Sequence, residues 1–183
     1  MLSKEMFISG MTALKKGYIG WEFDLSDDMQ ITFWYSAFKG LSDEVFNSMI
    51  AEYYAHNQHP PKCARDLTVV LVDKVVASTK VKPEIALAYV RDIVSECGGW
   101  AYEGRGEIYE KLKRYPALSE TVHDFEADLR RMSADDTYTA DRFRKAYEFK
   151  LRTKAIRQVD TALGLNIPDN SKLLESGFLP SEV

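Results

Sequence analysis

The chain has 183 residues, of which 45% are hydrophobic, and it carries a net charge of −4 with a pI near 5.5. This length suits one domain or two small ones, and the charge gives no overall attraction to nucleic acids or acidic membranes. Two cysteines are too few for a disulfide framework, and no run of about 18 apolar residues predicts a membrane span. We therefore expect a cytoplasmic protein in solution, without a cofactor.

Helical periodicity begins near the N-terminus. A first helix is predicted after Ser3 and is ended by Gly17 and Gly20, with one apolar face formed by Phe7, Met11, Leu14 and Tyr18. The stretch from Trp21 to Leu25 alternates weakly but has no partner strand. Ser26, Asp27 and Asp28 then predict the start of a second helix.

The segment from Phe33 to Leu67 predicts a helical hairpin followed by a third helix. Gly40 is expected to end one helix through a positive φ, and Ser42 is expected to cap the next. Pro61 is predicted to be the first residue of the helix that follows the Pro-Pro corner. Residues 67–76 are rich in β-branched side chains, yet we interpret them as helix because no partner strand is evident.

The second half predicts further helices. Pro83 is expected to open one, residues 98–107 are the most loop-like part of the chain, and a short helix is expected from Gly106 to Arg114. Thr139 is predicted to cap a long last helix that reaches about Leu163. Its apolar residues recur at steps of four, which makes the stripe wind around the helix: Phe143, Tyr147, Leu151, Ala155, Val159 and Leu163.

Together these patterns predict an all-α protein, a bundle of about seven to eight helices in two packed units. Residues 1–79 form the expected N-terminal helical domain and residues 80–163 the second helical unit. Residues 164–183 form a C-terminal tail. The valine-rich segment within 67–76 is apolar on more than one side, which leaves a homo-oligomer possible.

Sequence motifs for chemistry are scarce. There is no phosphate-binding loop and no dinucleotide fingerprint, so we expect no enzymatic activity. His56, His59 and Cys63 have zinc-ligand residue types, but the histidines flank a helix end beside two prolines, and solvated side chains explain them better. We therefore predict no metal site.

Two candidate binding regions remain. Lys150, Lys154 and Arg157 share one face of the last helix and could contact about three phosphates in a salt-sensitive, sequence-blind manner. A solvated helix face is the alternative and is favoured. In the tail, a short amphipathic segment with Leu173, Leu174, Phe178 and Leu179 is a candidate partner-binding element, with packing on its own domain or disorder as the alternatives.

Residues 1 to about 70 carry a pattern of core and corner residues. It comprises Phe7-x3-Met11-x2-Leu14-x3-Tyr18, then Trp34-Tyr35-x2-Phe38-Lys39-x-Leu41, Glu44-x-Phe46, Ile50, and Pro60-Pro61 with Leu67 after it. This pattern resembles the phage replicative helicase loader/inhibitor family. A later block, Phe143-Arg144-Lys145-Ala146-Tyr147, resembles a second block in longer phage proteins of this kind.

The resemblance implies a small helical DNA-replication adaptor in the host-cell cytoplasm. Such a protein would bind the ATP-bound hexameric replicative helicase, hold it inactive and deliver it to an origin occupied by the phage initiator protein. This chain is longer than the family type, and residues 80–163 are predicted to be folded where that type has a mobile part. A nucleic-acid-binding module and a phage inhibitor of another host protein are the alternative hypotheses.

Overall fold

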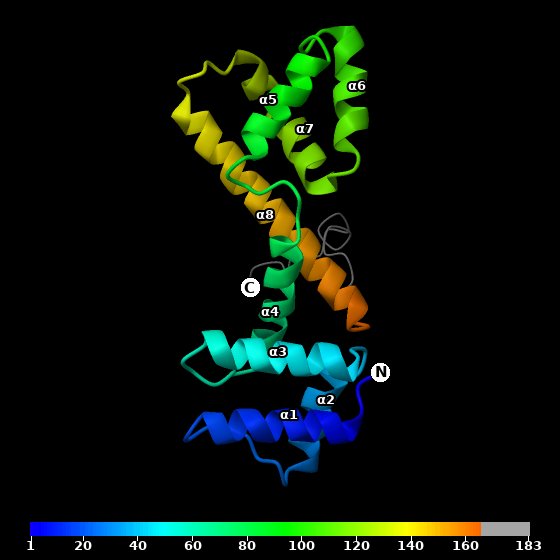
Figure 1. Cartoon of the computed structure of the whole chain (residues 1–183), viewed down its shortest axis with the longest axis vertical. Helices are drawn as coiled ribbons and strands as arrows, with labels where there is room; N and C mark the ends of the chain where they lie inside the picture. Colours follow the sequence, from blue (N-terminus) through cyan, green and yellow to red (C-terminus); the bar gives the residue numbers. More distant parts are fainter. Residues whose placement is uncertain (166–183) are drawn as a thin grey trace, which may run out of the picture. The chain divides into compact units, whose positions relative to one another are not determined.

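The computed structural model describes residues 1–165, and this part of the chain contains helices and no strands (Figure 1). The all-α prediction is therefore confirmed. Within the described residues, no helix is both long enough and apolar enough to cross a membrane. The helices are α1 (Lys4–Gly17), α2 (Asp28–Phe38), α3 (Asp43–His56), α4 (Ala64–Ala77), α5 (Ala86–Glu96), α6 (Tyr102–Leu112), α7 (Pro116–Arg131) and α8 (Thr137–Ala162).

The chain divides into two compact units. Unit 1 joins Met1–Thr68 to the segment that begins at Gln158, and unit 2 comprises Val69–Arg157. These divisions fall inside α4 and inside α8, whereas the boundaries expected from the sequence are residues 79–80 and 163–164. Unbroken helix runs through both observed divisions, so no proline, glycine or change of composition marks them.

The first three helices begin where the sequence predicts. The Ser3 hydroxyl accepts a hydrogen bond from Met6 N–H at 3.2 Å, and the Ser42 hydroxyl accepts one from Val45 N–H at 3.3 Å. The Asp27 carboxylate accepts bonds from two backbone N–H groups of the first turn of α2. Each side chain satisfies a donor that has no partner within its own helix.

Carboxylates that bind backbone N–H groups account for two helix starts that were predicted at the wrong residue. α4 begins at Ala64 and not at Pro61, because the Asp66 carboxylate accepts hydrogen bonds from the N–H groups of Lys62 and Cys63 and holds them outside the helix. α8 begins before Thr139, because the Asp136 carboxylate accepts from Thr139 N–H at 2.9 Å and takes the capping role.

The loop between α5 and α6 is shorter than predicted. Gly98 and Gly99 both have positive φ and reverse the chain, after which α6 begins at Tyr102, four residues before the expected start at Gly106. In the same region α5 begins at Ala86, after a turn at Pro83. The residues from 102 to 107, which have a loop-like composition, are therefore helical.

Gly40 follows α2 for a reason other than the predicted one. Its φ is not positive, unlike those of Gly20, Gly98, Gly99 and Gly164. A Cβ at Gly40 would lie 2.8 Å from the carbonyl oxygen of Ala162 and 3.0 Å from the backbone of Leu163. The glycine is required because the end of α8 passes against this backbone within unit 1.

The core of unit 1 is built from aromatic and aliphatic side chains of α1, α2 and α3. The Phe7 ring lies 5.6 Å from Phe46 and 6.5 Å from Phe38, and all three side chains are completely buried. α1 packs on α3, and a Cβ at Gly10 would lie 2.7 Å from the Phe46 ring. The predicted apolar faces of these helices thus meet one another.

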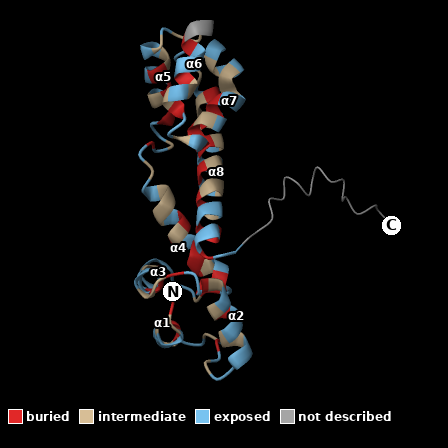
Figure 2. Cartoon of the chain, turned by 90° about the vertical axis from the view of Figure 1, so that its right-hand side faces the viewer, coloured by how far each residue is buried: buried red, intermediate tan, exposed pale blue. Residues whose placement is uncertain are grey.

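The core of unit 2 collects buried side chains from α5, α6, α7 and α8 (red in Figure 2). At its centre the Tyr147 hydroxyl donates a hydrogen bond to the carbonyl of Val81 at 2.8 Å. The four-step stripe of α8 is buried throughout, as its spacing predicts. Phe143, Tyr147 and Leu151 belong to the core of unit 2, and Val159 and Leu163 are buried in unit 1.

Candidate protein-binding pocket

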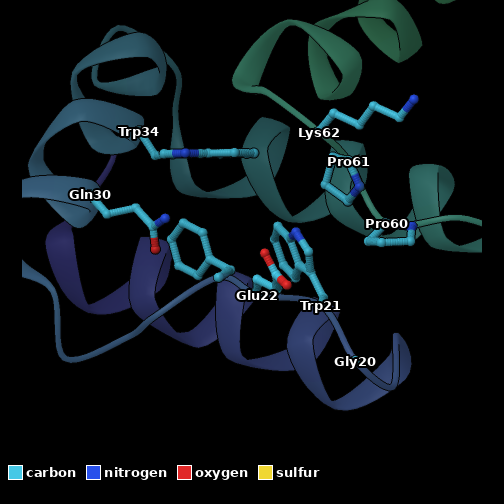
Figure 3. A pocket seen from close by; sticks show the side chains of 9 residues that line it. Gly20, Trp21, Glu22, Gln30, Trp34, Pro60, Pro61 and Lys62 are labelled. Carbon is cyan, nitrogen blue, oxygen red and sulfur yellow. The ribbon is translucent and has the colours of Figure 1, made fainter.

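Unit 1 contains a surface pocket of about 390 Å³ whose lining combines aromatic and proline side chains with Glu22, Gln30 and Lys62 (Figure 3). Three separate segments supply it: the turn after α1, the face of α2 that carries Trp34, and the Pro-Pro corner before α4. The lining residues are Gly20, Trp21, Glu22, Phe23, Gln30, Trp34, Pro60, Pro61 and Lys62.

The aromatic wall is formed by three rings in mutual contact. The Trp21 and Phe23 rings are stacked with centroids 4.9 Å apart, and the Trp34 ring meets them edge-on at 6.0 Å and 5.3 Å. Phe23 and Trp34 are buried, whereas Trp21 is only partly covered. A buried aromatic base therefore supports one tryptophan that still reaches solvent.

Local backbone geometry places these rings. α1 ends at Gly17, and the positive φ of Gly20 turns the chain so that Trp21 N–H donates to the carbonyl of Tyr18 at 3.2 Å. The Lys15 ammonium donates to the carbonyl of Phe23, and the Gln30 side-chain oxygen accepts from Asp24 N–H at 2.6 Å. The segment between α1 and α2 is thus tied to both helices.

The opposite wall is held by hydrogen bonds to the backbone before and after the two prolines. Tyr53 donates its hydroxyl to the carbonyl of His59 at 3.2 Å, and Tyr18 donates to the carbonyl of Asn57 at 2.9 Å. Asp66 holds the backbone N–H groups after Pro61. Burial raises the pKa of both tyrosine hydroxyls, so they remain protonated donors at neutral pH.

The pocket lining carries two charged side chains and no nucleophile with an adjacent base. Its charged side chains are Glu22 and Lys62, and its remaining lining side chains are aromatic, proline or amide. None of the lining residues is a serine, cysteine or histidine that could serve as a nucleophile with an adjacent base. Trp21 and Pro60 are the partly exposed apolar side chains of the lining, and they lie beside the exposed Glu22 and Lys62, so the pocket offers a partner both an aromatic contact and two charges.

Two of the three predicted cations of α8 pair with carboxylates of α7. The Lys150 ammonium pairs with Asp124, and the Lys154 ammonium pairs with Glu120 at 2.6 Å. Arg157 is the last residue of unit 2. A phosphate contact through these three side chains stays a prediction, and it would have to compete with the two ion pairs.

The remaining sequence-based candidates are the residues of the tail, a metal site and the two cysteines. The expected partner-binding residues Leu173, Leu174, Phe178 and Leu179 lie outside the described residues. Among the side chains that the structure describes, no group of three or more His, Cys, Asp or Glu is arranged to hold a metal ion. Cys63 is exposed, and both cysteines are free thiols.

Sequence reasoning missed the pocket because its walls are far apart in the chain. The available signal was the Trp21-x-Phe23 pair directly after Gly20. The alternation of apolar and polar residues there gave no indication that these rings lie near Trp34 or the prolines. Comparison of the chain with protein-family models, with curated proteins and with solved structures found no match.

Proposed function

We propose that this protein is a non-catalytic DNA-replication adaptor that binds another protein through the pocket of unit 1. The partner we propose is the ATP-bound hexameric replicative helicase of the host, which the adaptor would hold inactive and deliver to an origin bound by a phage initiator protein. The identity of the partner rests on the residue pattern of residues 1–70. The binding mode rests on the partly exposed Trp21 above a buried aromatic base.

The pattern and the pocket support each other through shared residues. Trp34 and Pro60-Pro61 belong both to the family-like pattern and to the pocket wall. Phe7, Phe38 and Phe46 from the same pattern are buried in the core of unit 1. A pattern that supplies part of a pocket wall fits a protein that must recognise a surface and perform no bond chemistry.

Co-purification with the helicase of the correct host, in the presence of ATP, tests the proposal. We expect a complex whose affinity falls by roughly tenfold or more in Trp21→Ala, because a partly buried tryptophan is a typical hot-spot anchor. Trp100→Ala is the matched control, since Trp100 is also a half-buried tryptophan but lies in unit 2. Absence of any complex would refute the partner, and equal loss in both variants would refute the pocket.

Inhibition of the helicase provides the functional readout. We expect stoichiometric adaptor to suppress the ATPase and unwinding activity of the helicase, and Trp21→Ala to require more protein for the same suppression. A chain truncated after residue 165 separates the pocket from the tail. Retained binding by this truncation would assign the contact to the pocket, and its complete loss would assign it to the tail leucines and Phe178.

A further inference from the structure

The outward side of α8 carries exposed aromatic residues alternating with cations. Tyr138, Arg142, Lys145, Phe149 and Arg152 follow one another at steps of four, three, four and three, so they line one face of the helix. We name this set the outer stripe. It lies opposite the buried Phe143 and Tyr147, and all of its residues belong to unit 2.

The aromatic members are far more exposed than a core role allows. Tyr138 is 72% exposed and Phe149 is 73% exposed, whereas other aromatic side chains of the same helix are fully buried. The cations between and beyond them reach solvent as well, with side chains of Arg142, Lys145 and Arg152 that are 50%, 68% and 48% exposed.

The cations of the outer stripe have carboxylate neighbours, but these ion pairs lie at the surface. Arg142 lies 3.8 Å from Asp128, and Arg152 lies 2.9 Å from Asp73. The Arg142 guanidinium also lies 5.6 Å from the centroid of the Tyr138 ring, so a base would stack on the face of Tyr138 that Arg142 does not cover. Lys145 lies 2.7 Å from Asp141. Exposed pairs of this kind contribute little to stability, so a phosphate group can replace the carboxylate at small cost.

We propose that the outer stripe binds single-stranded nucleic acid, with bases stacked on Tyr138 and Phe149 and phosphates held by the cations. The two rings are about 16 Å apart along the helix axis, which suits a strand of roughly four nucleotides or more. A duplex fits less well because its bases are already stacked on each other. A partner helix fits less well because cations interrupt the apolar surface.

This inference goes beyond the proposed adaptor function and does not depend on it. It also differs from the phosphate contact predicted for Lys150 and Lys154, which lie on the side of α8 that faces α7. The two hypotheses therefore predict opposite results in one binding experiment: loss on replacing the outer stripe, or loss on replacing Lys150 and Lys154.

Fluorescence anisotropy with the full chain and a labelled oligothymidylate of about 15 nucleotides tests the inference. At low salt we expect binding, with the logarithm of affinity falling against the logarithm of salt with a slope of about −2 for three cations. Tyr138→Ala and Phe149→Ala are each expected to weaken binding by roughly fivefold or more. Phe149→Trp keeps a stacking ring and is expected to retain binding.

The double variant Lys150→Ala with Lys154→Ala is the matched control and is expected to bind within about twofold of the parent chain. Circular dichroism of each variant verifies that the helices are intact. Absence of binding at low salt would overturn the inference. Loss in the double variant with unchanged affinity in Phe149→Ala would overturn it too, and so would tighter binding of a duplex of the same length.

Discussion

Replacement of Gly40 by alanine should destabilise unit 1, although alanine is normally the better residue near a helix. The added Cβ would lie 2.8 Å from the carbonyl oxygen of Ala162, an atom that can move only if backbone moves. Ordinary carbon contacts begin near 3.4 Å. Backbone displacement of several tenths of an ångström in a packed region costs about 1–3 kcal/mol.

Gly106→Ala is the matched control for this substitution. Gly106 lies in α6, and a Cβ added there would meet open space for 4 Å around it, so alanine should raise the free energy of unfolding by about 0.5–1 kcal/mol. Glycine-to-alanine substitution is thus expected to lower the free energy of unfolding at Gly40 and to raise it at Gly106, because only Gly40 has other backbone packed against it.

Urea unfolding in a Trp100→Phe background measures the effect of Gly40→Ala on unit 1. The control Gly106→Ala lies in unit 2, so its unfolding is followed by circular dichroism. The two remaining tryptophans, Trp21 and Trp34, both lie in unit 1, so their fluorescence reports that unit. With a urea dependence typical of small domains, a loss of about 2 kcal/mol lowers the midpoint by about 1 M. A neutral or stabilising Gly40→Ala would refute the close approach of the α8 end.

Two further predictions concern single hydrogen bonds. Tyr147→Phe should cost unit 2 about 1–3 kcal/mol because the buried carbonyl of Val81 loses its donor, as thermal unfolding would measure. Burial raises the pKa of the Tyr147 hydroxyl from 10.0 to about 12, so the unfolded chain loses this proton at lower pH than the folded chain. The free energy of unfolding should therefore fall between pH 10 and 12, and it should fall less steeply in Tyr147→Phe. Equal slopes for the two chains would contradict this. Ser3→Ala should cost unit 1 about 1 kcal/mol by removing the cap of α1, whereas Ser3→Asp should retain most of the stability in the same urea assay.

Helix identity was predictable wherever apolar residues repeat with helical spacing. The four-step stripe from Phe143 to Leu163 predicted both the burial and the winding of α8. Ser3 and Ser42 predicted helix starts because a cap acts within one turn of the chain. Local signals of this kind need no knowledge of the rest of the fold.

Four of the errors arose where a carboxylate or a distant part of the chain decided the outcome. Asp66 and Asp136 moved two helix starts by binding backbone N–H groups near the proline and threonine that were expected to begin those helices. Gly40 is required by a segment more than 120 residues away in the sequence. The pocket of unit 1 was missed for the same reason, since tertiary folding alone brings Trp21 beside Pro61.

Unit 1 is discontinuous in sequence, and this affects the order in which the units can form during synthesis. Its first 68 residues leave the ribosome early, but the segment that begins at Gln158 emerges only after all of Val69–Arg157 has been translated. Unit 2 is continuous and can therefore complete its fold first, which reverses the usual N-terminal-first order. Until then the nascent chain presents the backbone at Gly40 without its covering segment, and chaperones can act on unit 1 at this stage.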